Sequence, residues 1–362
     1  MQVLKFGGSS VANAGNISKT FQVIRQAIIK DQVIVVVSAL GGITDNLLQC
    51  ARASSIGDES YKDSLTLIEQ RHLDTVRQLI PVASQSGILS MVKRTCNELE
   101  DILKGIFLLR ELSGRTRDCV LGFGELLSSR ILSAGLLCEG VENSWKDSRD
   151  LIQTDSRYGH AQVDFKATKK RMTEFFQETP VSLLIVPGFI ASDANGITTT
   201  LGRGGSDYSA AIFGSMLSAG SIEIWTDVSG MMTADPRLVS HARVIPNISY
   251  HEAMELSHFG AKVIYPPTLR PVMSKGIPVR IKNTFSPSDP GTLIEKISRH
   301  SGSSIRGISS IPEIALLSLE GSGMIGIPGF SKRLFEALSA NQINVILITQ
   351  ASSEHSICVG VE

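Results

Sequence analysis

Short runs of β-branched residues alternate with longer amphipathic segments in the N-terminal three quarters of this 362-residue chain. Strands are expected at residues 3–6, 33–38, 183–187 and 223–226, and a helix at residues 14–30. Strands joined through helical crossovers run parallel, and a parallel sheet has to be covered by helices on both faces. This rhythm therefore predicts an α/β fold with a mainly parallel central sheet.

Two other segments interrupt this rhythm. Helical spacing dominates residues 43–137, as in Leu99, Ile102 and Ile106, which predicts a helical lobe placed on the sheet. A hairpin is expected over residues 191–201, because Asn195-Gly196 supplies the positive φ angles of a tight turn.

The C-terminal part reads as a second, smaller unit. After a loose connector, the pattern predicts a strand, a glycine-rich turn, a helix and two further strands, at residues 314–319, 321–329, 331–341, 344–349 and 356–361. A β-α-β-β run without its closing helix and strand is typical of an incomplete ferredoxin-like α+β domain. We therefore expect a catalytic domain, a linker and a partial domain at residues 1–297, 298–312 and 313–362, with the last completed by residues outside this chain.

Composition narrows the class of protein. The 35 basic residues balance 35 acidic ones, so no overall charge attracts nucleic acid or an anionic membrane. The N-terminus has no pattern of a secretory signal, and apolar runs such as residues 33–37 are too short to span a bilayer. Five scattered cysteines without a CxxC pair suit a reducing compartment. We expect a cytoplasmic protein with no nucleic-acid or membrane partner.

A first candidate site follows the first strand. Lys5 precedes Gly7, Gly8 and Ser9, so backbone N–H groups could approach a phosphate while Lys5 supplies a fixed charge. Paired glycines after a strand also form simple tight turns, and the GxxxxGK[ST] spacing of a Walker A loop is absent. The motif alone leaves both interpretations open.

A stronger signal is the run from Gly202 to Asp207, which opens a helix rich in small residues. Unpaired N–H donors and the positive end of a helix dipole favour an anion there, and Arg203 can bind a carboxylate with two hydrogen bonds. Asp207 could instead be a simple acid at a helix N-terminus.

Polar residues at the ends of other apolar segments complete the candidates. Thr226 and Asp227 end a predicted strand, where ligands bind in open α/β sheets, although an ordinary turn would use the same residues. Arg237 could equally be a solvated charge, and Lys262, in an apolar stretch, could extend to solvent. Further polar residues of this kind, not distinctive singly, are Ser38, Thr44 and Glu125.

Six segments together resemble the aspartokinases in order and spacing. They are KFGGSS at residues 5–10, SALGGIT at 38–44, GFGELLS at 122–128, LGRGGSDYSAA at 201–211, WTDVSGMMTADPR at 225–237 and FGAKVIYP at 259–266. The resemblance implies a three-layer amino-acid-kinase fold with an eight-stranded, mainly parallel sheet. It also implies ATP as phosphoryl donor, Mg²⁺, and L-aspartate as acceptor, giving 4-phospho-L-aspartate in the first step of lysine, threonine and methionine biosynthesis.

The same resemblance implies residue roles. Lys5 would hold the transferring phosphoryl group and Asp207 would orient Lys5, as the two catalytic residues. Arg203 would bind the α-carboxylate of aspartate and Glu125 its ammonium group. The remaining substrate-binding residues would be Ser38, Thr44 and Ser206, and the ATP-binding residues would be Lys5, Gly7, Gly8, Ser9, Thr226, Asp227, Arg237 and Lys262. Magnesium would be held by phosphates and water, so no protein ligand is expected.

Three positions depart from the family's pattern. Met232 stands where aspartokinases commonly have a tyrosine near the nucleotide, and Tyr265 replaces a common histidine. Ser9 replaces a threonine and keeps its hydroxyl. None of these changes removes a charge that the chemistry requires.

The C-terminal segment resembles the start of an ACT regulatory domain. The run ITQASSE at residues 348–354 is similar to the bifunctional aspartokinase/homoserine dehydrogenases, whose kinase part this chain would be. This implies an amino-acid effector, threonine rather than lysine, near Gly323, Ile325, Asn344 and Gln350. A homo-oligomer is expected, with a dimer through the ACT or catalytic domains.

Two other functions fit part of the pattern. A kinase of the same fold could act on glutamate, acetylglutamate or carbamate with a different carboxylate-binding site. A catalytically silent amino-acid sensor could transmit binding through the C-terminal sheet, but such a protein would not need Lys5, Arg203 and Asp207 together.

Overall fold

The computed structural model describes residues 1–260, 263–298, 305–321, 327–350 and 356–361. The chain divides into two compact units, Met1–Ile308 and Ser309–Glu362, and each is described by itself. Lys262, Gly323 and Ile325 lie outside the described residues.

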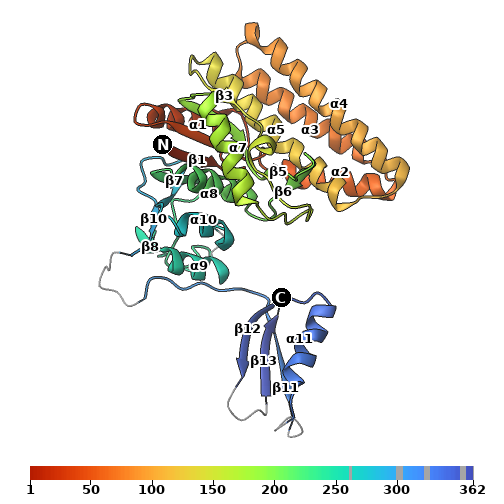
Figure 1. The fold of residues 1–362 in the computed structure, drawn as a ribbon, viewed down its shortest axis with the longest axis vertical. Helices are drawn as coiled ribbons and strands as arrows, with labels where there is room; N and C mark the ends of the chain where they lie inside the picture. The colour runs from red at the N-terminus through yellow and green to blue at the C-terminus, as the bar shows by residue number, and fades with distance from the viewer. Residues whose placement is uncertain (261–262, 299–304, 322–326, 351–355, 362) are drawn as a thin grey trace. The chain divides into compact units, whose positions relative to one another are not determined.

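Eight strands of the described residues form the central sheet of the first unit, in the order β3-β4-β2-β1-β7-β9-β10-β8 (Figure 1). Their bounds are β1 Gln2–Phe6, β2 Val33–Val37, β3 Ser144–Trp145, β4 Leu183–Pro187, β7 Ser221–Thr226, β8 Asn247–Ser249, β9 Val279–Asn283 and β10 Thr292–Glu295. All neighbours pair in parallel except β9 and β10, so the predicted, mainly parallel sheet is confirmed. β10 is antiparallel to β9 because the short connection between them leaves no room for a helical crossover.

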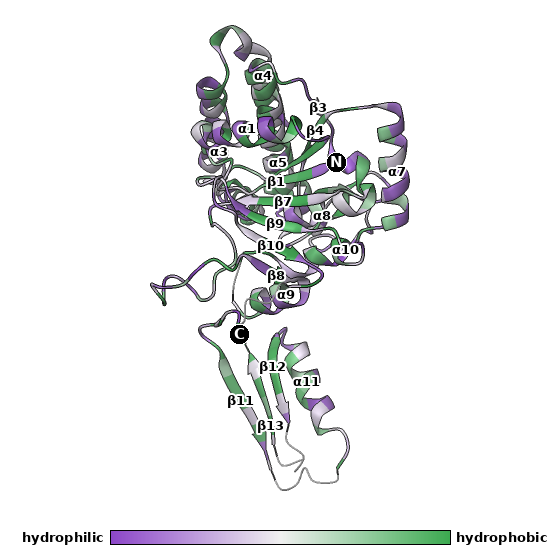
Figure 2. Ribbon diagram, turned by 90° about the vertical axis from the view of Figure 1, so that its left-hand side faces the viewer, coloured by the Kyte–Doolittle hydropathy of each residue, from purple (hydrophilic) through white to green (hydrophobic). Residues whose placement is uncertain are grey.

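The two faces of the sheet are buried by different helices (Figure 2). Leu4 and Phe6 of β1 belong to one core cluster, whereas Val3 belongs to the other. The strand period of two thus sends successive apolar side chains into opposite layers. Continuous apolar strands such as VIVVV of β2, buried at all five residues, are required by this three-layer arrangement.

Helices α1 to α5 cover one face, and α7, α8 and α10 the other (Figures 1 and 2). The helix bounds are α1 Ala14–Ile28, α2 Ile43–Ile56, α3 Tyr61–Leu79, α4 Gln85–Leu109, α5 Gly114–Cys138, α6 Ser148–Leu151, α7 Phe165–Glu178, α8 Gly205–Leu217, α9 Tyr250–His258 and α10 Arg270–Met273, with 3₁₀ turns at Val82–Ser84 and Pro266–Leu269. Four of these, α2 to α5, are the helical lobe predicted over residues 43–137.

Helix α5 is long and apolar enough to cross a membrane by length and composition, among the described helices. Of its most apolar window, 83% is buried inside the protein. This is the environment of a helix in a protein core, where an apolar surface on all sides is needed for packing.

The hairpin before α8 has a different turn from the predicted one. β5 (Ile190–Ser192) and β6 (Thr198–Thr200) pair antiparallel, as predicted, but five residues separate them. Gly196 has a φ of 77°, whereas Asn195 is not among the residues with positive φ. The Asp193 carboxylate accepts hydrogen bonds from the N–H groups of Asn195 and Ile197, both at 2.9 Å. This Asx-type arrangement fixes the wider loop in place of a two-residue turn.

The second unit has three strands, β11 (Ala315–Glu320), β12 (Val345–Gln350) and β13 (Ser356–Val361), among its described residues. They form an antiparallel sheet in the order β11-β13-β12, and α11 (Phe330–Ala340) packs on one face. The predicted β-α-β-β order is therefore confirmed, with strand and helix ends within two residues of those expected.

Candidate active site

An ion pair at the end of the central strand is the centre of the site. The Lys5 Nζ atom lies 2.6 Å from Asp207 Oδ1, and the two side chains are only 11% and 12% exposed. Lys5 is held on β1 between Val36 of β2 and Ile224 of β7, and Asp207 lies in the first turn of α8. An acid in a first helical turn is stabilised by the helix dipole, so strand and helix together fix both charges.

Two glycine-containing loops meet beside this pair. Gly7 N–H donates to the Trp225 carbonyl at 3.0 Å, and a Cβ on Gly7 would lie 3.4 Å from Lys5 Nζ. A Cβ on Gly8 would lie 3.2 Å from the carbonyl oxygen of Ala39. The loops after β1 and β2 approach closely because side chains are absent there.

The loop before α8 needs glycine for its conformation. Gly204 caps α8 with a φ of 66°, and a Cβ on Gly205 would lie 2.6 Å from Cδ2 of Phe189. The first turn of α8 therefore presents backbone N–H groups and a positive dipole end beside Lys5.

A cavity of about 490 Å³ opens over these elements. It brings together every residue predicted for catalysis or substrate binding, and one glycine of the phosphate loop: Lys5, Gly8, Ser38, Thr44, Glu125, Arg203, Ser206 and Asp207. These residues come from β1, the end of β2, α2, α5 and α8, which are far apart in the sequence. The cavity offers cations and backbone donors, and one buried acid, to a bound molecule.

Glu125 is the buried acid, 3% exposed on α5. Burial raises the pKa of its carboxyl to about 8, opposed by backbone hydrogen bonds and by the charge of Lys5. Its Oε2 atom accepts no hydrogen bond from any described residue. A ligand ammonium group would supply the missing donor and favour the ionised carboxylate.

Of the residues predicted to bind nucleotide, Lys5 and Gly8 line this cavity, and the other described ones do not. Thr226 and Asp227 follow at the end of β7, where the Thr226 hydroxyl donates to Asp227 Oδ1 at 3.2 Å. Arg237 is 87% exposed and pairs with Asp235 at 2.7 Å. The other two, Gly7 and Ser9, belong to the loop after β1. Their contacts with a nucleotide stay a prediction.

The described residues contain no group of three or more histidine, cysteine, aspartate or glutamate side chains that could hold a metal ion. Of the acids that line the cavity, Asp207 is paired with Lys5, Glu125 is buried and Asp45 is exposed. This donor set does not form a protein cage for Mg²⁺, and it suits an ion that arrives with nucleotide phosphates.

The remaining predicted positions are distributed elsewhere. Asn344 precedes β12 and Gln350 ends it, and both are exposed. Met232 pairs with Val244 in an isolated bridge, and Tyr265 lines a second cavity.

Sequence reasoning missed Asp118, a fully buried carboxylate on α5. Its Oδ2 atom accepts hydrogen bonds from Gly159 N–H at 2.8 Å and from Thr200 N–H at 2.9 Å. It thereby fixes the end of β6, two residues before the loop that carries Arg203. The polar sequence around it, RTRDC, gives no sign of this role.

Replacing Asp118 with alanine is expected to lower the free energy of unfolding by about 2–4 kcal/mol, because the buried N–H of Thr200 and the part-buried N–H of Gly159 lose their acceptor. Urea unfolding followed by circular dichroism measures the change. Asp118→Asn keeps an acceptor oxygen and should cost clearly less. Equal losses in the two variants would show that packing, and not these hydrogen bonds, sets the effect.

Phe189 and Asp45 were also missed, and both line the cavity. Phe189 has a φ of 67°, which is uncommon for a non-glycine residue, and packs against Gly205. No local sequence pattern predicts such a conformation.

Comparison with known proteins identifies relatives over the whole chain. The description of the amino acid kinase family matches residues 1–283, and that of the ACT domain matches residues 317–362. A bifunctional aspartokinase/homoserine dehydrogenase 2 of Arabidopsis thaliana is 38% identical over 365 residues, covering 99% of this chain and 40% of the relative. A bifunctional enzyme of Haemophilus influenzae is 35% identical and covers 100% and 45%. The chain thus spans less than half the length of these relatives.

The similar solved structures are also aspartokinases. Aspartokinase III of E. coli in complex with lysine and aspartate is similar with a TM-score of 0.83 and 30% identity, over 100% of this chain and 79% of that one. Its complex with aspartate and ADP also has a TM-score of 0.83. A Clostridium acetobutylicum aspartate kinase has a TM-score of 0.69 and 27% identity, over 100% and 96%.

Proposed function

Because the chain belongs to the amino acid kinase family, and within it to the aspartokinases, with an ACT domain at its C-terminal end, we propose that it transfers the γ-phosphoryl group of ATP to the side-chain carboxylate of L-aspartate. The observation that carries this proposal is the cavity in which a buried Lys5–Asp207 pair, an exposed arginine and a buried acid converge. The proposed product is 4-phospho-L-aspartate.

The arrangement suits attack by a carboxylate on a triphosphate. The acceptor is already ionised at neutral pH, so no protein base has to activate it. The barrier is the repulsion between anions, which fixed cations and backbone donors lower. Lys5 would neutralise the transferring phosphoryl group, and Asp207, 2.6 Å away, would keep its ammonium group in place. The Gly7-Gly8 loop and the first turn of α8 would donate N–H groups to the phosphates.

The α-carboxylate and the ammonium group of aspartate would each face a side chain of opposite charge. The α-carboxylate would accept hydrogen bonds from Arg203, and the ammonium group would donate to the free Oε2 of Glu125. Ser38, Thr44 and Ser206 would supply hydroxyl groups around it. Thr226, Asp227, Arg237 and Lys262 would bind the nucleotide, and Mg²⁺ would neutralise its phosphates.

The buried Glu125 makes a pH dependence of substrate binding part of the proposal. Because burial raises the pKa of Glu125 to about 8, its carboxyl is mostly protonated at pH 6–7 in the free protein. Bound aspartate needs the ionised form, so KM for aspartate should fall as pH rises from about 6 to 8 and then level off. Glu125→Gln should raise KM and flatten this dependence. Initial rates at saturating ATP test it, and an equally steep profile in Glu125→Gln would assign the titration to another group.

The stability of the free protein should have the opposite dependence on pH. With a folded-state pKa above the ordinary value of 4.5, the native state binds more protons than the unfolded state between these two values. The contribution of Glu125 to the free energy of unfolding is therefore fully present below pH 4.5 and is lost as pH rises toward 8.

The finer assignments belong to the same proposal. The reaction would open lysine, threonine and methionine biosynthesis in the cytoplasm, and the ACT domain would bind an amino-acid effector, threonine rather than lysine. The E. coli aspartokinase III structure contains lysine, so both amino acids have to be tested. A homo-oligomer through the ACT or catalytic domains, and a dehydrogenase part in the parent protein, would complete the resemblance to the bifunctional relatives.

The deciding experiment is ATP turnover with Mg²⁺ and L-aspartate, with the acyl phosphate trapped by hydroxylamine. Formation of aspartyl hydroxamate is expected, and inhibition by threonine or lysine would identify the effector. Turnover of glutamate, acetylglutamate or carbamate without turnover of aspartate would contradict the substrate. Aspartate binding without any turnover, in protein that binds ATP, would favour the silent sensor.

A further inference from the structure

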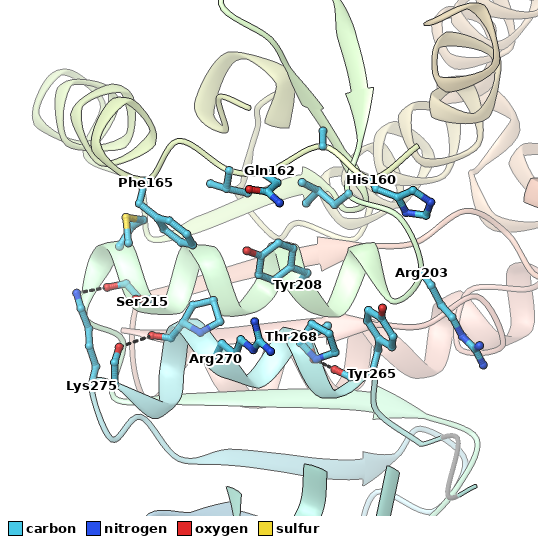
Figure 3. A pocket seen from close by; sticks show the side chains of 17 residues that line it. His160, Gln162, Phe165, Arg203, Tyr208, Ser215, Tyr265, Thr268, Arg270 and Lys275 are labelled. Carbon is cyan, nitrogen blue, oxygen red and sulfur yellow. Dashed lines mark hydrogen bonds between the residues drawn. The ribbon is translucent and has the colours of Figure 1, made fainter. Parts of the chain in front are cut away.

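A second cavity of about 770 Å³ is lined by other residues of α8 than those that line the first, namely Tyr208, Ser215 and Met216. The segment at residues 160–165 forms one wall, and the Pro266–Leu269 turn with α10 forms the other (Figure 3). Tyr208 projects into it from α8, whereas its neighbour Asp207 pairs with Lys5. Consecutive residues of one helix thus face different cavities.

The charge in this cavity has one sign. Its lining contains Arg203, Arg270 and Lys275 and no aspartate or glutamate. Asp164 lies in the same segment but does not line the cavity, and its carboxylate accepts hydrogen bonds from the backbone N–H groups of Lys166 and Ala167 at 3.0 Å. Uncompensated cations in a concave surface concentrate a field that attracts anions.

Several polar groups there have no hydrogen-bond or ion-pair partner among the residues that the structure describes. No described residue forms a hydrogen bond or ion pair with the guanidinium of Arg270, and none bonds the Tyr208 hydroxyl or the Gln162 amide. Figure 3 shows Tyr208 between Gln162 on one wall of the cavity and Arg270 on the other. Lys275, by contrast, donates to the Ser215 carbonyl. Burial raises the pKa of Tyr208 despite the nearby charge of Arg270, so its hydroxyl stays a donor.

Apolar surface surrounds these donors. Phe165, Met216 and Pro267 line the cavity beside Tyr208 and Tyr265. The lining thus combines polar and charged groups with apolar and aromatic side chains, and sites for small molecules use both kinds of surface. Inorganic phosphate alone would use the cations but leave this surface uncovered.

We propose that this cavity binds a small organic anion, a carboxylate or phosphate with an apolar body, whose charged group contacts Arg270 and Tyr208. Arg270 supplies a planar pair of donors that fits either kind of anion, and the Tyr208 hydroxyl adds a third. The site is separate from the proposed substrate cavity, although Arg203 lines both. The proposal of this anion site does not depend on which molecule accepts the phosphoryl group in the proposed reaction.

Direct binding of defined probes tests the site. The probes are 4-fluorobenzoate and 4-fluorophenyl phosphate, followed by ¹⁹F NMR, with neutral 4-fluorobenzyl alcohol for comparison. At least one anion should bind saturably and about tenfold more tightly than the alcohol, because a charge-assisted contact contributes about that factor. The two anions distinguish a carboxylate site from a phosphate site. No turnover is needed, so failure here is separate from failure of the proposed kinase activity.

Variants locate the binding. Arg270→Gln should weaken the anion about tenfold and Tyr208→Phe about threefold, with unchanged melting temperatures because neither group bonds another described residue. Arg94→Gln removes the same charge from an exposed position on α4 and should change nothing. Lys5→Ala, which alters only the substrate cavity, should also leave probe binding unchanged.

Four results would overturn the proposal. The first is no saturation by either anion at about 10 mM, a concentration well above the dissociation constant expected for one charged contact and a small apolar body. The second is that the neutral alcohol binds as tightly as the anions, and the third is that Arg270→Gln and Tyr208→Phe bind the anion as tightly as the wild type. Loss of probe binding in Lys5→Ala would place the probe in the substrate cavity and have the same consequence.

Discussion

Replacing Lys5 with alanine is expected to lower kcat for aspartate phosphorylation about a thousandfold, while KM for aspartate changes less than about threefold. The Lys5 ammonium group lies at the end of β1, beside the Gly7-Gly8 loop, and its charge is needed most when negative charge passes between two anions. Aspartate itself is proposed to bind through Arg203 and Glu125, which the substitution leaves in place.

Hydroxamate formation at saturating ATP gives kcat and KM for this variant. One ambiguity needs a control, because alanine leaves the Asp207 carboxylate, 12% exposed, without its cation. The double variant Lys5→Ala/Asp207→Asn removes the stranded charge. Recovery in the double variant would assign the defect to Asp207, and near-normal turnover of Lys5→Ala would remove Lys5 from the mechanism.

Replacing Arg203 with alanine should raise KM for aspartate about 10- to 100-fold with kcat within about threefold of the wild type. Arg203 is exposed at the mouth of the cavity, and no described residue pairs with it. Its removal should therefore leave the fold unchanged and take away only a bidentate contact with a carboxylate, which acts on substrate and transition state alike.

Initial-rate kinetics over a wide range of aspartate concentration measures this effect. Arg203→Lys keeps the charge but loses the paired geometry, so its KM should lie between those of alanine and arginine. The matched control is Arg94→Ala, an exposed arginine on α4 that lines neither cavity. An unchanged KM in Arg203→Ala would refute the proposed carboxylate contact.

The sequence predicted the parts of the fold that depend on local pattern. The runs of β-branched residues were enough to predict the strands β1, β2, β4 and β7. The alternation of strand-like and helical segments was enough to predict a mainly parallel sheet. The antiparallel β10 and the wide turn after Asp193 were not predicted. The direction of β10 depends on the short connection that joins it to β9. The wide turn depends on the Asp193 side chain, which accepts hydrogen bonds from backbone N–H groups of the loop.

The candidate site was predictable where glycines or charges stand next to strand and helix ends, as at Lys5 and Arg203. The grouping of the substrate residues came from a resemblance of six segments in order, and single residues such as Ser38 or Glu125 carried no signal alone. Asp118 and Phe189 could not be found, because their roles depend on partners 41 and 82 residues away, or on a strained φ. Such contacts exist only once the chain has folded.

The placement of Lys5 on the central strand has a consequence for partly denatured protein. β1 pairs along its whole length with β2 and β7, and Val3, Leu4 and Phe6 are fully buried. Amide hydrogen exchange in β1 should therefore require global unfolding, whereas the glycine loop around Arg203 can exchange through local opening. In mild denaturant, aspartate binding should weaken while Lys5 is still held in the sheet. Loss of activity should then precede loss of secondary structure, because substrate capture depends on the less protected of the two segments.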